Sequence, residues 1–271
     1  MNEVPKRILT ALFCTIYTFG MNHYNIYTTA LYYIILTIIC LFEYHYKIDS
    51  TRKKITILLT SIVYFLSIGY ITGDVEIKYL SIALPIVMSL FSIELFSGKE
   101  NPMLSIGTDL IGIIWICLPM LLAIVISYPY GKDGLRYHDP RLMYGIMTFV
   151  FMSDSGAFFG GRFFGSTKLF PKISPKKTWE GAISGAVVSC CSYYIISPIN
   201  LLTKREWITV MIMSIITGVI GDLIESMFKR DLKIKDSGSI LPGHGGALDR
   251  IDGLLYAIPF VYSYLVFLGK V

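Results

Sequence analysis

Long apolar runs are the feature of this sequence that most constrains its fold. They recur along the 271-residue chain, and most have the length of about 17 to 25 residues that a helix needs to cross roughly 30 Å of hydrocarbon. The composition, with 54% hydrophobic residues, 16% charged residues and a mean hydropathy of +0.61, excludes an ordinary soluble domain. We therefore predict an all-α, polytopic integral membrane protein.

Charged breaks divide the sequence into about nine predicted transmembrane helices. About five of them form an N-terminal region, 1–141, and the others a C-terminal catalytic region, 142–271. The five cysteines fall inside apolar runs, so we expect them to pack rather than to form disulfides or bind metal. The predicted spans lie near residues 8–23, 26–43, 55–72, 79–96, 105–128, 142–160, 181–202, 207–228 and 251–269.

The distribution of basic residues predicts how the chain is oriented. Of the 24 Lys and Arg residues, 17 fall on the N-terminus and on alternate loops. Because basic residues are retained on the cytoplasmic side of a membrane, we predict that the N-terminus is cytoplasmic. The two most basic loops, 162–180 and 229–250, then share the cytoplasmic face.

Carboxylates flank the second of these loops. Asp222 and Glu225 are three residues apart near the end of the eighth span, which places them on one helix face. Asp249 and Asp252 have the same spacing at the start of the ninth span. An ionised carboxylate at bilayer depth costs roughly 2.5 kcal/mol or more unless it is paired or hydrated. Carboxylates gathered by two helices suit Mg²⁺, and Asp154, near the end of the sixth span, is a further candidate ligand.

Basic residues and glycines surround these carboxylates. Positive charge beside a metal indicates a phosphate-bearing substrate, and a glycine-rich turn lets backbone N–H groups approach an anion. The candidates in this loop are Lys229, Arg230, Arg250, His244, Gly245 and Gly246.

Structural explanations of the same residues stay open. Basic residues at a membrane edge are often topology signals or headgroup contacts. The four carboxylates could be salt-bridge partners of Arg230 and Arg250, and His244 could serve as a hydrogen-bonding residue in the loop.

The first basic loop carries a predicted phosphate clamp at the N-terminus of the seventh span. It combines hydroxyls, lysines and a proline-set turn before a helix N-terminus, where anions bind favourably. The predicted contacts are Ser174, Lys176, Lys177 and Thr178. Glycines upstream have a spacing that more often marks close helix packing than a ligand site. They are Gly156, Gly160, Gly161 and Gly165.

These motifs together resemble the signature of the phosphatidate cytidylyltransferases, also called CDP-diacylglycerol synthases. The fixed spacing over the C-terminal half makes the resemblance specific, whereas the N-terminal half matches mainly in its pattern of spans. The signature residues here are Ser226, Lys229, Arg230, Lys235, Asp236, Gly238, Leu241–Gly246, Asp249, Arg250, Ile251 and Asp252, with Asp154–Phe158 and Ser174–Gly181 upstream.

The resemblance implies a multi-pass enzyme that makes CDP-diacylglycerol and pyrophosphate from CTP and phosphatidate. It implies that Asp222 and Asp249 bind the metal, in a binuclear centre of Mg²⁺ and a monovalent cation such as K⁺, and it suggests a homodimer. The compact chain resembles bacterial members, so we expect the inner (cytoplasmic) membrane. The expected partners are CTP, phosphatidate and the lipid bilayer, without nucleic acid.

The predicted reaction is an in-line attack by the lipid phosphate on the α-phosphorus of CTP, promoted by positioning and charge neutralisation. One alternative is a CTP-dependent polyprenol or phytol kinase, and another is a cytidylyltransferase acting on an ether-linked lipid. A less favoured alternative is an ion-coupled transporter, because intramembrane carboxylates often mark ion pathways.

Overall fold

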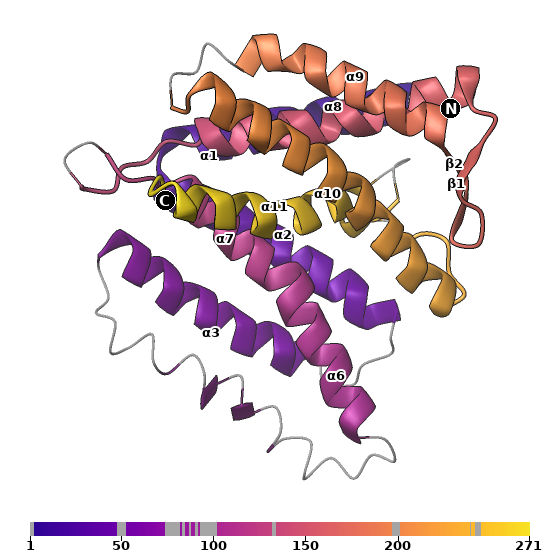
Figure 1. Cartoon of the computed structure of the whole chain (residues 1–271). Helices are drawn as coiled ribbons and strands as arrows, with labels where there is room; N and C mark the ends of the chain where they lie inside the picture. Colours follow the sequence, from indigo (N-terminus) through magenta and orange to yellow (C-terminus); the bar gives the residue numbers. More distant parts are fainter. Residues whose placement is uncertain are drawn as a thin grey trace. The chain divides into compact units, whose positions relative to one another are not determined.

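The protein is mostly helical in its computed structural model (Figure 1). The helices are α1 (Glu3–Tyr24), α2 (Ile26–Lys47), α3 (Lys53–Thr72), α6 (Pro102–Gly112), the π-helical η1 (Ile113–Cys117), α7 (Leu118–Ile126), α8 (Arg141–Phe164), α9 (Trp179–Ile196), α10 (Lys204–Asp231), the 3-10 helix η2 (Leu248–Arg250) and α11 (Asp252–Phe267). The structure describes residues 3–47, 53–73, 82, 85, 86, 88, 89, 92, 102–131, 134–196, 201–238, 240, 241 and 245–271.

Several of these helices identify a membrane protein. Four are long and apolar enough to cross a bilayer: Ile26–Lys47, Met103–Ile126, Arg141–Phe164 and Lys204–Asp231. Two shorter apolar helices are Thr56–Thr72 and Asp252–Phe267. Eight of the predicted spans fall on helices, whereas most of the fourth, 79–96, lies outside the described residues. The total of nine spans and their orientation stay predictions.

The chain divides into two compact units. The first consists of Met1–Val125 and Ser237–Leu248, and the second of Ile126–Asp236 and Asp249–Val271. The glycine-rich loop thus groups with the N-terminal helices. The assignment of 1–141 as an N-terminal transmembrane region and of 142–271 as the catalytic region stays a prediction.

In the first unit, buried polar contacts join α2 to its neighbours. Tyr64 of α3 donates to the carbonyl oxygen of Cys117 at 2.6 Å, and its hydroxyl lies 3.0 Å from that of Thr37 on α2. Nε2 of His45 on α2 lies 3.0 Å from Oδ1 of Asp109 on α6, and both side chains are buried. Polar contacts of this kind join membrane helices, because lipid is as apolar as the helices and offers no hydrophobic driving force.

In the second unit, a glycine seam lets α8 and α9 lie side by side (Figure 1). A Cβ atom placed on Gly156 would lie 2.9 Å from the Cα atom of Gly185, and one placed on Gly181 would lie 3.1 Å from the Cα atom of Gly161. Such short separations leave no room for a side chain. The prediction of close helix packing is confirmed for Gly156, Gly160 and Gly161, whereas a Cβ atom on Gly165 would meet the carbonyl oxygen of Gly161 on its own helix.

Gly185→Ala is expected to lower the free energy of unfolding by about 2 kcal/mol, since overpacking a tight contact costs about 1 to 3 kcal/mol. The added methyl group would meet the carbonyl oxygen of Ser153 and lie 3.1 Å from the Cβ atom of Ala157. Thermal unfolding in detergent measures the change. Gly107→Ala is the control, because a Cβ atom there meets nothing within 4 Å. Equal stability of the two variants would contradict the conclusion that close packing of α8 and α9 at these glycines stabilises the protein.

The mostly helical fold agrees with the all-α prediction, and it includes one short β-hairpin that was not predicted. Strands β1 (Lys168–Phe170) and β2 (Ser174–Thr178) pair antiparallel between α8 and α9, with Phe170 opposite Ser174. The predicted proline-set turn is therefore extended backbone. Apolar periodicity does not reveal this hairpin, because its strands are short, rich in lysine and outside the apolar runs.

Candidate active site

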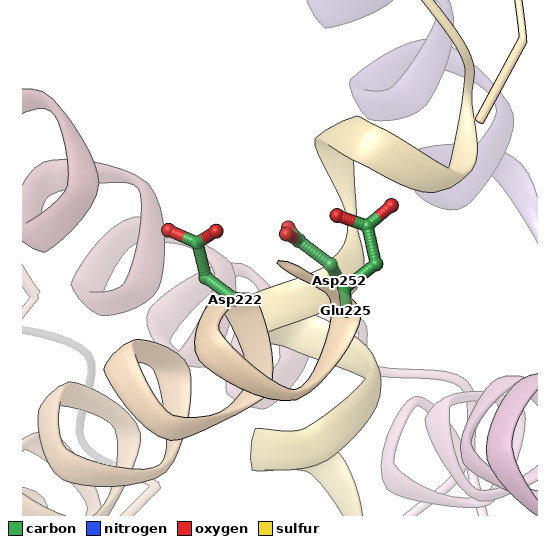
Figure 2. A group of neighbouring side chains, drawn as sticks. All are labelled: Asp222, Glu225 and Asp252. Carbon is green, nitrogen blue, oxygen red and sulfur yellow. The ribbon is translucent and has the colours of Figure 1, made fainter. Parts of the chain in front are cut away.

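Three carboxyl groups from two helices converge in the second unit. Asp222 and Glu225 lie on α10, and Asp252 is the first residue of α11. One oxygen from each lies within 4.8 Å of the other two, and Figure 2 shows the three side chains projecting to the same side of the two helices. Glu225 and Asp252 are buried, whereas Asp222 is partly exposed. We call Asp222, Glu225 and Asp252 the carboxylate cluster.

Glycines beside the carboxylate cluster explain why its members meet. Gly221 precedes Asp222 and Gly253 follows Asp252. A Cβ atom on Gly221 would lie 2.7 Å from the carbonyl oxygen of Asp252 and 3.1 Å from the Cα atom of Gly253. The backbones of α10 and α11 are therefore in close contact next to Asp222 and Asp252. The carboxylate of Asp252 also accepts the N–H of Gly253 at 2.9 Å.

Lys177 connects the hairpin to the carboxylate cluster. Its Nζ atom forms an ion pair with Oδ2 of Asp222, and the two side chains are 24% and 33% exposed. A residue predicted to bind phosphate thus lies beside a predicted metal ligand. This contact places one cation of the hairpin at the cluster.

Lys229 bridges two further carboxyl groups. It donates to Oε2 of Glu225 one helical turn earlier and to Oδ1 of Asp249 at 2.8 Å. Its side chain is 15% exposed, while those of Glu225 and Asp249 are 2% and 7% exposed. Because a buried carboxylate without a cation is costly, Lys229 compensates for both acids.

The other two acids predicted to bind metal lie close to this arrangement. Asp249 is outside the carboxylate cluster, but it bonds to Lys229. Asp154 of α8 interacts electrostatically with Asp222 and Lys177. All five predicted acids therefore belong to one charged region of the second unit, and the assignment of Asp249 to a metal stays a prediction.

The donor set of the carboxylate cluster fits a hard divalent cation. Carboxylate oxygens are the protein ligands that Mg²⁺ prefers. Within the part of the chain that the structure describes, Oε1 of Glu225 is buried and receives no hydrogen bond. The carboxyl groups of this region also outnumber the two lysines that pair with them. A bound cation would balance this negative charge.

Arg230 fastens the hairpin to the end of α10. Its Nε atom donates to the carbonyl oxygen of Ile173, between the two strands, at 3.3 Å, and its Nη1 atom donates to that of Ile234 at 3.4 Å. Arg230 and Arg250 both have exposed side chains, as phosphate contacts require. Their phosphate contacts stay predictions.

The predicted clamp residues divide between structural and accessible positions. Thr178 is 4% exposed, and its hydroxyl oxygen accepts the N–H of Gly181 at 3.2 Å, which caps α9. Ser174 begins β2 and is partly buried, whereas Lys176 is exposed. Of the four predicted clamp residues, Lys177 is the one with an ion pair to the carboxylate cluster.

Glu180 anchors the base of the hairpin, a role that the sequence analysis missed. Its carboxylate accepts the hydroxyl of Ser166 at 2.7 Å and the backbone N–H groups of Ser166 and Thr167 at 3.1 Å. The hydrogen bond from the Ser166 hydroxyl is the largest of several that lower the pKa of Glu180 to about 2. An acid in the first turn of a helix was the available signal, but its partners lie across the hairpin.

The glycine-rich loop Ser237–Leu248 is described at both ends, while His244 lies outside the described residues. Leu241 and Gly245 exchange backbone hydrogen bonds of 3.0 and 3.2 Å. Gly245 has a φ of 91°, which glycine adopts readily, and Gly246 is buried. The predicted phosphate contacts of these loop residues stay predictions.

The fold and the carboxylate cluster define a membrane protein with an acidic, lysine-paired site. The model of the Cytidylyltransferase family matches residues 5–268, and this chain therefore belongs to that family.

Curated relatives named phosphatidate cytidylyltransferase confirm the resemblance. The protein from Haemophilus influenzae is 45% identical over 137 residues, covering 48% of this chain and 47% of the relative. That from Staphylococcus haemolyticus is 40% identical, covering 51% and 52%. Phosphatidate cytidylyltransferase 5, chloroplastic, from Arabidopsis thaliana is 32% identical, covering 71% and 52%. The chain spans about half the length of the curated relatives it matches.

Proposed function

We propose that this chain is a phosphatidate cytidylyltransferase, which converts CTP and phosphatidate into CDP-diacylglycerol and pyrophosphate for phospholipid biosynthesis. The observation that carries the proposal is the carboxylate cluster of Asp222, Glu225 and Asp252, with Lys177 and Lys229 bound to it. This combination suits two phosphate-bearing substrates and a cation. The family match and the names of the relatives support the same activity.

The reaction is an in-line nucleotidyl transfer. An oxygen of the phosphatidate phosphate forms a bond to the α-phosphorus of CTP, and the bond from that phosphorus to the bridging oxygen of the β-phosphate breaks. Pyrophosphate leaves with the bonding electrons. Because the attacking phosphate is ionised at neutral pH, the protein contributes mainly by positioning the substrates and by neutralising charge.

The carboxylate cluster would hold Mg²⁺, which would offset the negative charge of the phosphates when bound. Asp154, which interacts electrostatically with Asp222, is proposed as a further ligand of the cation or as a partner of its ligands. Asp249 would become available as a ligand when Lys229 turns from it to a substrate phosphate. A monovalent cation such as K⁺ as the second ion is part of the proposal.

The basic residues would bind the phosphates of the two substrates. Lys177 and Lys229 would exchange a carboxylate partner for a phosphate oxygen, which keeps each ammonium group neutralised. The other predicted clamp and loop residues are proposed as phosphate contacts too. The further proposed contacts are Ser174, Lys176, Thr178, Arg230, His244, Gly245, Gly246 and Arg250.

Lys177→Ala is expected to raise the KM for CTP or for phosphatidate about tenfold or more, because a charge-assisted hydrogen bond is worth about 1.5 to 3 kcal/mol. Steady-state kinetics with each substrate varied in turn measures the effect. Lys168→Ala, which removes an exposed lysine of β1 in the same hairpin, should leave both constants near those of the wild type. Unchanged constants for Lys177→Ala would assign that lysine a structural role alone.

The membrane arrangement is proposed as well. The apolar helices and the bias of Lys and Arg support a multi-pass protein of the cytoplasmic membrane with its N-terminus and active site facing the cytoplasm. We also propose about nine spans and a homodimer.

Identification of both products tests the proposed reaction. The full-length protein in detergent micelles, given CTP, phosphatidate and Mg²⁺, should yield CDP-diacylglycerol and an equal amount of pyrophosphate by mass spectrometry and phosphate analysis. With polyprenol or phytol in place of phosphatidate, no CDP should form. Release of CDP with a phosphorylated alcohol would instead identify a lipid kinase.

A further inference from the structure

A buried glutamate of α2 reaches into the glycine-rich loop of the first unit. Glu43 lies in the last turns of α2 and is 3% exposed. Its Oε2 atom accepts the backbone N–H of Leu248 at 3.0 Å, although the two residues are 205 positions apart. Leu248 is the last residue of the loop in this unit. The side chain thus fixes the end of the loop directly.

Two glycines of the loop pack closely against the carboxyl group of Glu43. A Cβ atom on Gly238 would lie 2.9 Å from Cγ of Glu43, with the carboxyl group closer still. A Cβ atom on Gly246 would lie 2.8 Å from Oε2 of Glu43 and 2.7 Å from the backbone nitrogen of Gly238. Gly238 stands near the start of the loop and Gly246 near its end. Glu43 therefore contacts the loop near both of its ends.

The cost of this burial argues for a purpose beyond packing. A buried carboxyl group is tolerated when its oxygens are satisfied. Among the described residues, Oε1 of Glu43 has no hydrogen-bond partner, whereas Oε2 accepts the N–H of Leu248. An apolar side chain would fill the end of α2 at lower cost, but it would not accept the N–H of Leu248.

We propose that Glu43 is a positioning residue that holds Gly238 and the loop end Gly245–Leu248 in the conformation used for nucleotide binding. The inference rests on the proposed function, because that function assigns phosphate contacts to Gly245 and Gly246. A loop binds its ligand more tightly when it is held in the bound conformation beforehand. Glu43 supplies that restraint from α2 without touching the substrate.

The test combines exchange of the loop amides with kinetics of the full-length protein. Glu43→Ala is expected to speed hydrogen–deuterium exchange in the loop peptide containing Leu248 about tenfold or more, and to raise the KM for CTP by about the same factor. The kcat should change less than about threefold, because positioning of the nucleotide is lost rather than a group at the reacting atoms.

Two further variants separate the loop restraint from a folding defect. Glu43→Gln keeps a carbonyl oxygen for the N–H of Leu248, so exchange and KM should stay within about threefold of the wild type. Gly246→Ala places a methyl group against the carboxyl group of Glu43 and should reproduce the effects of Glu43→Ala. Leu41→Ala removes a fully buried side chain two residues away on the same helix. It should lower the thermal midpoint but leave loop exchange and KM near the wild type.

Each outcome decides the proposal. Wild-type loop exchange in Glu43→Ala would overturn it, as would equal effects of Leu41→Ala and Glu43→Ala on loop exchange and KM. If the wild type transfers no cytidylyl group, the proposed function fails, while the exchange comparison still shows whether Glu43 restrains the loop.

Discussion

Asp252→Asn should reduce cytidylyl transfer at least about a thousandfold while the protein stays folded in the membrane. The substitution keeps the size of a side chain that lies within 4.8 Å of Asp222 and Glu225 but removes a charge that the proposed cation requires. Loss of one electrostatic contact in an active site costs about a hundredfold to a thousandfold, and loss of the cation costs more. Initial rates at saturating CTP and phosphatidate measure the effect.

The same variant gives a reading of metal binding that does not depend on turnover. For the wild type, Mg²⁺ at about 100 times its Kd should stabilise the protein by about 2.7 kcal/mol, whereas Asp252→Asn should respond little. Asp231→Asn, which changes an exposed carboxylate at the end of α10, should behave like the wild type in both assays. Normal activity and a normal Mg²⁺ response of Asp252→Asn would remove Asp252 from the site.

Lys229→Ala should lower the free energy of unfolding by about 3 kcal/mol in addition to abolishing activity. It leaves Glu225 and Asp249 buried without their shared cation, and removing one partner of a buried ion pair costs about 3 to 5 kcal/mol. Thermal unfolding in detergent without Mg²⁺ should show a midpoint lower by about 6 to 12 °C.

The matched control for this variant is Lys204→Ala, which removes an exposed lysine at the start of the same helix. Its midpoint should stay near that of the wild type, because exposed lysines contribute little to stability. If Lys229→Ala were as stable as this control, the bridge between Glu225 and Asp249 would not be important for folding. The substrate assignment of Lys229 would then depend on kinetics alone.

The sequence predicted those features of the fold and site that arise from local spacing. Apolar runs indicated the helices, and the three-residue spacing of Asp222 and Glu225 placed both acids on one face of α10. Gly156, Gly160 and Gly161 were correctly assigned to helix packing. Each of these conclusions depends on neighbours within one or two helical turns.

Contacts between distant residues could not be predicted in this way. The ion pair of Lys177 with Asp222 requires a hairpin whose strands are too short to show an apolar period. The bond from Leu248 to Glu43 crosses 205 positions. Asp249 was predicted to be a main metal ligand, whereas close packing at Gly221 brings Asp252 to Asp222 and Glu225.

Transfer of label from CTP to lipid tests the central claim most directly. Full-length protein in micelles with phosphatidate, Mg²⁺ and CTP labelled with ³²P at the α-phosphate should move label into the lipid phase, and omission of phosphatidate or addition of EDTA should prevent the transfer. Label that stays in the aqueous phase with folded protein, across a panel of phosphatidate acyl chains, would contradict the assignment.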